Sequence, residues 1–200
     1  MSRDESTPTD GRTPRPGSAA ADGDPAGAIP DPQLVVVCGL PGVGKTTVAA
    51  RAAELIGGDV LRTDAVRKDL FPDPDYTEAE SRAVYGELLS RAAARLGDGE
   101  SVVLDATFKR RRSRRNARGL ARAAGVPLRT IKVECDVSVV EIRIENRDGL
   151  SDADFEIHRK FRREYEPLQI DHSVVDNSGS EAATLEQVDA LLEPGRDGNL

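Results

Sequence analysis

The chain has 200 residues, a net charge of -7 and only 4% aromatic residues. This length suits one domain with a compact core. The negative charge argues against a protein that coats nucleic acid with its whole surface. No apolar run reaches the roughly 18 residues that a membrane-spanning helix needs, so we predict no membrane segment.

The two ends of the chain differ in composition from its middle. Residues 1–33 are rich in proline, glycine and polar residues and have almost no large apolar side chain. Such a segment cannot bury enough surface to offset its ordering entropy, so we predict a disordered tail. It also lacks the continuous apolar stretch of a secretory signal. We expect one domain over residues 34–194 and a flexible C-terminus at 195–200.

The chain has 2 cysteines and 2 histidines, which are scattered along the sequence and argue against a structural zinc site. Cys38 and Cys135 each end an apolar, strand-like run. We interpret both as buried thiols in a reducing compartment, and we expect a cytoplasmic protein. No feature of the sequence decides the oligomeric state, and we expect a monomer.

Short β-branched runs predict strands, and apolar residues at helical spacing predict helices between them. In chain order we predict a strand at 34–38, a helix at 44–56, a weaker strand at 60–63, a helix at 77–96, a strand at 101–105, a helix at 109–124, a strand at 128–135, helices at 137–147 and 152–166, a strand at 172–176 and a helix at 181–192. Glycines after several helices and a capping-box pattern at Thr77 and Glu80 support these limits. The alternation predicts an α/β fold whose mostly parallel, five-stranded sheet is covered by helices on both faces.

The loop after the first strand fits the pattern G-x-x-x-x-G-K-[ST], with a strand before it and a helix after it. The glycines let successive N–H groups point inward, where they hold phosphate oxygens, and the helix N-terminus adds partial positive charge. We therefore predict a site for ATP and Mg²⁺. Its nucleotide-binding residues are Gly39, Pro41, Gly42, Val43, Gly44, Lys45, Thr46 and Thr47. Lys45 is expected to reach the β- and γ-phosphates, and the Thr46 hydroxyl to bind the metal.

An acid at the end of a second strand completes the predicted metal site. Asp105 ends the run SVVLD and, together with Thr46, is our candidate for Mg²⁺. The alternative is an ordinary turn residue at a strand end. Ala106 follows, where motor ATPases usually have a glutamate that polarises water, so hydrolysis is disfavoured as the purpose of the site. No Asn-Lys-x-Asp string is present, which argues against a GTPase switch.

Asp64 and Arg67 follow the weak strand and lie roughly one helical turn apart. Asp64 could accept the proton of an acceptor hydroxyl, and Arg67 could hold a phosphate or the developing charge. Asp64 could equally be the N-cap of a short helix, because aspartate is a favoured cap. Spacing alone does not decide between these two interpretations.

The ordered set of motifs resembles the P-loop kinase group that includes polynucleotide kinase, zeta toxins and chloramphenicol phosphotransferase, and in particular its small AAA-type members. The resemblance covers about residues 34–180. It depends on the phosphate loop, Asp64-x-x-Arg67, Leu104–Thr107 and Arg143-x-x-x-Arg147. It implies a P-loop NTPase fold with strand order 2-3-1-4-5, a general-base role for Asp64, and adenine near Asn177.

Arginines in two consecutive predicted helices are typical of a kinase lid, which we place at about residues 143–166. Arg143 and Arg147 lie four apart on one helix face, and either could neutralise transition-state charge. The alternative is ordinary solvated ion pairing with neighbouring glutamates. We interpret His158, which is isolated in the second helix, as a solvated surface residue.

Residues 106–133 include no acid, while residues 109–132 include many arginines and lysines. Such a segment is either a solvated helix face or a track for an anionic acceptor, such as a nucleic-acid end. We therefore predict an ATP-dependent kinase that phosphorylates a hydroxyl of a small molecule or of a nucleic-acid end. The alternative is a nucleotide-binding ATPase or switch that a partner protein regulates.

Overall fold

The computed structural model describes residues 31–145 and 152–193. Its elements, in chain order, are β1 (Leu34–Cys38), α1 (Lys45–Ile56), β2 (Asp59–Arg62), α2 (Thr63–Leu70), α3 (Glu78–Gly97), β3 (Val102–Asp105), α4 (Arg111–Ala124), β4 (Leu128–Glu134), α5 (Val137–Glu145), α6 (Asp152–Glu164), β5 (Ser173–Asp176) and α7 (Glu181–Leu192). The predicted C-terminal segment, and the predicted tail apart from residues 31–33, lie outside the described residues. In the described ranges, no helix is long and apolar enough to cross a membrane.

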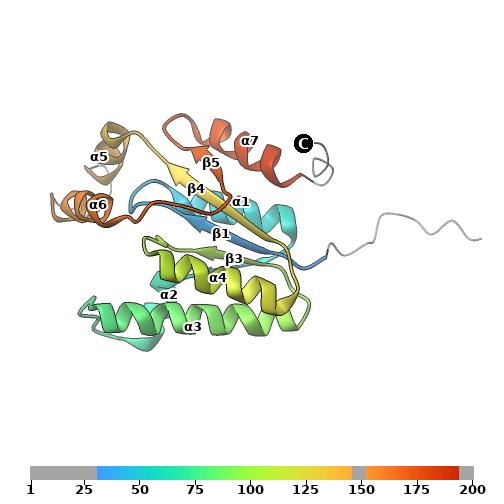
Figure 1. The fold of residues 1–200 in the computed structure, drawn as a ribbon. Coiled ribbons are helices and arrows are strands. Elements are labelled where there is room, and N and C mark those ends of the chain that lie inside the picture. The colour runs from blue at the N-terminus through green and yellow to red at the C-terminus, as the bar shows by residue number, and fades with distance from the viewer. Residues whose placement is uncertain (1–30, 146–151, 194–200) are drawn as a thin grey trace, which may run out of the picture.

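The five strands form one sheet in the order β2-β3-β1-β4-β5, and every neighbouring pair is parallel. This confirms the predicted fold class and the strand order that the resemblance implied. Helices α1 and α7 lie on one side of the sheet, and α3 and α4 lie on the other (Figure 1). Because all strands run the same way, their carboxyl ends meet at one edge, which is where α/β sheets bind ligands.

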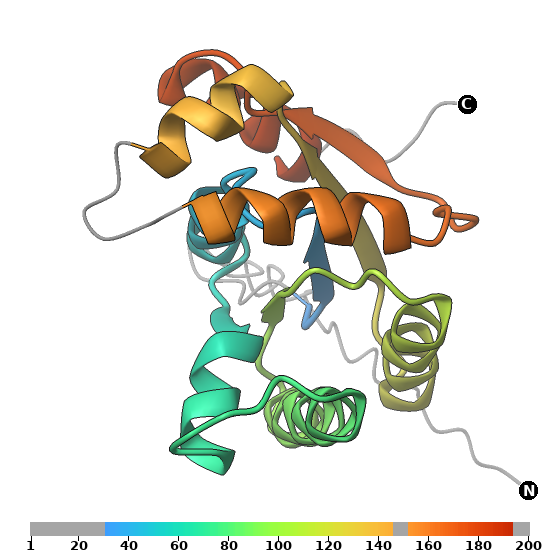
Figure 2. The same ribbon diagram turned by 90° about the vertical axis from the view of Figure 1, so that its left-hand side faces the viewer.

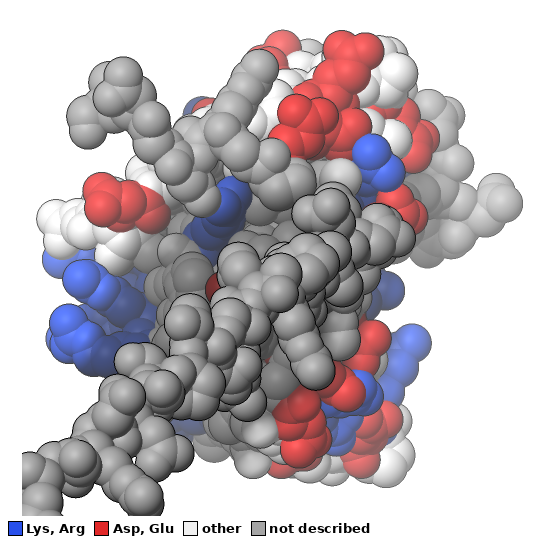
Figure 3. Space-filling view, turned by 90° about the vertical axis from the view of Figure 1, so that its right-hand side faces the viewer, with Lys and Arg blue, Asp and Glu red and all other residues white. Residues whose placement is uncertain are grey.

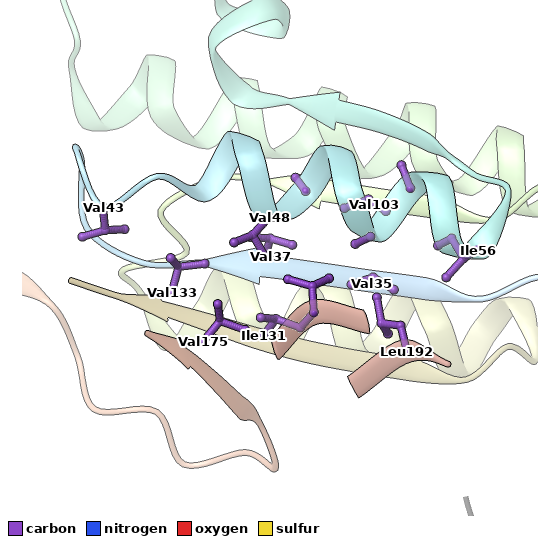
Figure 4. Close-up of a cluster of buried hydrophobic side chains, with 14 of the residues drawn as sticks. Val35, Val37, Val43, Val48, Ile56, Val103, Ile131, Val133, Val175 and Leu192 are labelled. Atoms are coloured by element: carbon purple, nitrogen blue, oxygen red, sulfur yellow. The ribbon is translucent and has the colours of Figure 1, made fainter. Parts of the chain in front are cut away.

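The central strand β1 is buried on both faces, and each of its residues is at most 2% exposed. Val35 and Val37 pack into a core with α1 and α7 (Figure 4), whereas Leu34, Val36 and Cys38 pack into a second core with α3 and α4. This alternation follows from the two-residue period of a strand. Two cores on one strand fix its position, and with it the start of the loop that follows Cys38.

The helix ends confirm several predicted signals. At α3, the Thr77 hydroxyl accepts a hydrogen bond from the Glu80 N–H, and the Glu80 carboxylate accepts one from the Thr77 N–H, which makes a capping box. Gly57 ends α1 and Gly125 ends α4, both in the left-handed conformation. The short helix α2 was not among the predicted elements and entered only as the alternative in which Asp64 caps a helix. Its two aliphatic residues at helical spacing are Val66, which is buried, and Leu70, which is exposed, so its apolar pattern is short.

The basic segment 109–132 divides between the interior and the surface. Arg114 is only 3% exposed, and its guanidinium donates to the carbonyls of Phe108, Glu166 and Pro167 at 2.6, 3.0 and 2.8 Å. Lys109 forms an ion pair with Glu164 at 2.6 Å and lies over the Phe161 ring. Part of the segment therefore fixes the loop after β3 to the end of α6.

We predict that Arg114→Met lowers the free energy of unfolding by about 3 kcal/mol, because three carbonyl groups lose their donor inside the protein. Urea unfolding measures this change. The control is Arg115→Met on the exposed side of the same helix, which we expect to change stability by less than about 0.5 kcal/mol. Equal stability of the two variants would show that the guanidinium of Arg114 does not fix these loops.

Candidate nucleotide and metal site

The loop between β1 and α1 has room for glycine but not for larger residues at two positions. A Cβ on Gly39 would lie 2.5 Å from the Val133 carbonyl oxygen, and a Cβ on Gly44 would lie 1.9 Å from Asn177 Nδ2. Gly44 also has a φ of 87°, a left-handed conformation that side chains disfavour. The predicted loop is thus pressed against β4 and against the residue that follows β5.

Lys45 lies at the start of α1 and folds back over the loop. Its ammonium group donates to the Leu40 carbonyl at 2.9 Å. Burial lowers the pKa of Lys45, and the negative charges of Asp105 and Asp64 oppose this shift. The Lys45 ammonium thus interacts electrostatically with two carboxylates that follow two different strands.

Thr46 and Asp105 lie together, as predicted for a metal site. The Thr46 hydroxyl donates to Asp105 Oδ2 at 2.9 Å, and Asp105 is only 5% exposed. Both supply hard oxygen ligands, which suit Mg²⁺. No group of three or more His, Cys, Asp or Glu residues that could hold a metal occurs in the described part of the chain, so the remaining ligands would be phosphate oxygens and water, as is usual for Mg²⁺.

Arg62 belongs to this site but was not among the predicted residues. It ends β2 directly opposite Asp105 in the sheet register. Its Nη2 donates to the Thr46 hydroxyl at 3.3 Å, and its Nε lies 3.3 Å from Asp105 Oδ2. The guanidinium thus supplies positive charge to the same two oxygens that could bind a cation. The sequence did contain a signal that could have identified Arg62 as a site residue: it stands at the end of a strand, two residues before Asp64.

Asp64 lies in the first turn of α2 and is exposed. The N-cap of α2 is Arg62, so the interpretation of Asp64 as a helix cap is wrong. The charge of Asp64 acts on Lys45 and on the buried hydroxyl of Tyr85. Asp64 thus contributes negative charge to the surroundings of Lys45.

Arg67 has a different environment, between α2 and α3. It forms an ion pair with Glu80 at 3.5 Å, and its guanidinium lies 5.0 Å from the centre of the Tyr76 ring. Its side chain is 13% exposed. Arg67 thus connects α2 to the capping box of α3. Contact between Arg67 and an acceptor, which the sequence suggested, stays a prediction.

The predicted lid corresponds to α5 and α6, which lie across the carboxyl ends of the strands (Figure 2). Arg143 on α5 is close to the loop, because a Cβ on Gly44 would lie 3.9 Å from Arg143 Nη1. Its Nη1 is 3.5 Å from Cys135 Sγ. Arg147 lies outside the described residues. Of the two predicted lid arginines, Arg143 is therefore the one that the structure places beside the loop.

Two further side chains hold the loop through its carbonyl groups. Asn177 is 6% exposed; its Nδ2 donates to the Val43 carbonyl at 2.8 Å, and its Oδ1 accepts from Thr184. Its amide thus supports the loop from the side of β5. His158 is 1% exposed, so its interpretation as a solvated residue is wrong; its Nδ1 lies 2.7 Å from the Pro41 carbonyl oxygen. Neither contact could be read from the sequence, since the partners are 134 and 117 residues apart.

A cavity of about 390 Å³ lies beside the loop, between the end of β4 and α6. Gly39 and Leu40 form one wall, and His158, Arg162 and Tyr165 form another. Its remaining lining residues include Lys132, Glu134 and Asp136. The lining thus combines charges of both signs with aliphatic residues such as Val43 and Val133.

We predict that Lys45→Ala removes about half or more of the stabilisation by ATP. A ligand at 100 times its Kd stabilises a protein by about 2.7 kcal/mol, and loss of a charged donor weakens binding about 10- to 100-fold. The rise in Tm on adding ATP measures this effect. The control is Lys68→Ala at an exposed position of α2, which should keep the full rise. An unchanged rise in Lys45→Ala would refute the phosphate site.

Comparison with known proteins agrees with this geometry. A family model described as an AAA domain matches residues 34–168. An uncharacterized protein of Mycobacterium tuberculosis is 38% identical in an alignment over 138 residues, and the match covers 62% of this chain and 28% of that protein. This chain therefore spans well under half of that relative's length.

Two solved structures have a similar fold. The APS kinase CysC of Mycobacterium tuberculosis, in complex with AMPPNP and APS, has a TM-score of 0.65 at 21% identity and covers 82% of this chain and 99% of its own. A gluconokinase of Sinorhizobium meliloti has a TM-score of 0.62 at 23% identity, with 81% and 94% covered. At these identities the likeness concerns the fold. The chain belongs to the AAA_33 family of AAA domains and has a P-loop kinase-like fold, as the resemblance of its motifs indicated.

Proposed function

We propose that this protein is an ATP-dependent phosphotransferase that moves the γ-phosphoryl group to an acceptor hydroxyl. One observation carries the proposal: exposed Asp64 lies in the first turn of α2, two residues after Arg62, which contacts both Thr46 and Asp105, and the charge of Asp64 acts on the Lys45 ammonium. An accessible carboxylate at this end of the sheet is a candidate to accept the proton of an acceptor hydroxyl.

The proposed reaction assigns a task to each group. The loop N–H groups and Lys45 hold the triphosphate, and Thr46 with Asp105 would hold Mg²⁺, which supplies charge neutralisation when bound. Asp64 accepts the proton of the acceptor hydroxyl as its oxygen bonds to the γ-phosphorus. The bond between that phosphorus and the β,γ-bridging oxygen breaks, and ADP leaves. Arg143, or Arg147 of the predicted lid, would stabilise the charge on the transferred group.

The residues after Asp105 favour transfer over hydrolysis. The next two residues are Ala106, which is buried, and Thr107, whose hydroxyl oxygen lies 3.3 Å from that of Tyr85. Neither side chain has a carboxylate that could polarise water. Asp64 is exposed and therefore accessible to a molecule from solution. These features support an alcohol acceptor more than a partner-regulated ATPase. We take a small-molecule alcohol as the first candidate acceptor.

We predict that Asp64→Asn lowers the rate of phosphoryl transfer about 10²- to 10⁴-fold, the usual contribution of a general base. ATP affinity should stay within about threefold, because the amide keeps the shape of the side chain. The measurement is transfer of labelled γ-phosphate to a panel of sugars, nucleosides, hydroxylated amino acids and 5′-hydroxyl oligonucleotides.

The matched control is Asp69→Asn, which lies on the same helix and pairs with Arg91 at the surface. It should transfer phosphate at the wild-type rate. If no alcohol accepts phosphate, and both variants hydrolyse ATP as the wild type does, the phosphotransferase proposal fails. The nucleotide-switch alternative then remains.

A nucleic-acid end is a second candidate acceptor, because the outer side of α4 is strongly basic. Its exposed arginines are Arg111, Arg112, Arg115, Arg118 and Arg122, and none of these side chains forms an ion pair within the described residues. Basic side chains gather at the left edge of Figure 3, where α4 lies. Arginines in the first turn of a helix oppose its macrodipole by about 0.3–1 kcal/mol each, and α4 has no acid there. An anionic polymer would relieve this unfavourable arrangement.

We predict that replacing Arg112, Arg115 and Arg118 together with serine weakens binding of a 5′-hydroxyl oligonucleotide. The plot of the logarithm of the binding constant against the logarithm of the salt concentration should become less steep by about 2, because three phosphate contacts on a single strand are lost. Fluorescence anisotropy over a salt series measures both quantities. A triple serine variant of Arg82, Arg91 and Arg95 on α3 loses the same charge and should bind normally. Equal losses in both variants would refute a specific role for α4.

A further inference from the structure

Several carbonyl groups of the phosphate loop receive hydrogen bonds from side chains. Lys45 donates to Leu40 at 2.9 Å, Asn177 Nδ2 donates to Val43 at 2.8 Å, and His158 Nδ1 lies 2.7 Å from the Pro41 oxygen. A carbonyl oxygen only accepts, so His158 Nδ1 carries the proton and is the donor. The imidazole belongs to α6, which is 117 residues away in sequence.

The bond to Pro41 determines the direction of the next N–H group. In a trans peptide, the C=O and the following N–H point in opposite directions, and the described chain has no cis peptide bond. When the Pro41 carbonyl points at α6, the Gly42 N–H must point away from α6. We propose that His158 is a positioning residue, which aims the Gly42 N–H at the phosphates of a bound nucleotide. The inference rests on the nucleotide-binding part of the proposed function.

The surroundings of His158 fit a positioning role. The side chain is only 1% exposed, and its ring stacks on Phe155, with centroids 6.0 Å apart and planes 8° apart. Phe155 itself packs against the core that includes Val43. Stacking on Phe155 thus fixes the orientation of the imidazole plane, and the hydrogen bond to the Pro41 carbonyl fixes the position of Nδ1. An apolar residue could fill this space, but it would leave the Pro41 carbonyl without this donor.

A second carbonyl bonded from a distant element provides a comparison. Asn177, the residue after β5, orients the Val43 carbonyl and thereby the N–H of Gly44. The loop is therefore held at two carbonyl groups, by α6 and by the residue after β5. Preorganised N–H groups bind anions better than mobile ones, because no free energy is spent in turning them. Loss of the His158 donor should thus affect phosphate binding rather than contacts with the rest of the nucleotide.

The test compares His158→Leu, which has no donor, with His158→Asn, whose Nδ2 lies where the imidazole Nδ1 was. We expect the leucine variant to bind ATP about tenfold more weakly, which corresponds to one hydrogen bond. The asparagine variant should stay within about threefold of wild type. AMP leaves the β- and γ-positions empty, so its affinity should change little in either variant. Isothermal titration calorimetry with ATP and AMP measures all four affinities.

The matched control is His172→Leu. His172 also bonds a backbone carbonyl, that of Ile170 at 2.8 Å, but it is exposed and lies in its own loop. It should bind both nucleotides as wild type does. Melting of the unliganded variants checks folding, and His158→Gln, whose donor lies at the other ring position, replaces the leucine variant if the latter does not fold.

The role of His158 would be overturned if the variant without a donor bound ATP as tightly as wild type does. It would also be overturned if that variant lost the same affinity for ATP and for AMP. In both cases the proposed function would still stand. If the wild-type protein itself does not bind ATP, the proposed function fails instead.

Discussion

The crowding around the loop between β1 and α1 is the constraint on which the candidate site depends. The Val133 carbonyl leaves no space for a side chain at Gly39, and the Asn177 amide leaves none at Gly44. Together with His158 at the Pro41 carbonyl, these neighbours come from β4, from the end of β5 and from α6. The loop follows a strand that is buried in two cores, so its starting point is rigid as well. A backbone held in this way can present N–H groups to an anion with little reorganisation.

Positive and negative side chains lie around this loop, and they could bind the phosphates of a nucleotide and its metal ion respectively. Lys45 and Arg62 supply positive charge, while Asp105 and Asp64 supply negative charge. Thr46 and Asp105 already share a hydrogen bond, and Arg62 contacts both. A buried charge is costly unless it is paired, and here the buried Asp105 carboxylate has the Arg62 guanidinium as its partner. The same four residues come from β1–α1, the β2–α2 boundary and β3, so the parallel sheet is what brings them together.

The structure also separates basic residues that looked alike in sequence. Arg114 is buried and donates to three carbonyl groups, whereas Arg115 next to it is exposed. Helical geometry makes this difference, because adjacent residues on a helix point about 100° apart. Lys109 and Arg110 form ion pairs at the helix start, which leaves an uncompensated basic surface only on the outer side of α4. The proposed binding of an anionic polymer therefore concerns the outer side of α4.

The sequence by itself determined the α/β class, the limits of most elements, the phosphate loop and the pairing of Thr46 with Asp105. These depend on local signals: the periodicity of apolar residues, glycines at helix ends, and a motif whose spacing is fixed by the chemistry of phosphate binding. The contacts of Arg62, Asn177 and His158 could not be predicted in this way. Their partners lie in other elements, and only the register of parallel strands and the path of α6 across their ends bring them within hydrogen-bonding distance. Tertiary structure thus decided which side chains hold the loop, because a hydrogen bond between residues more than a hundred positions apart leaves no periodic trace in the sequence.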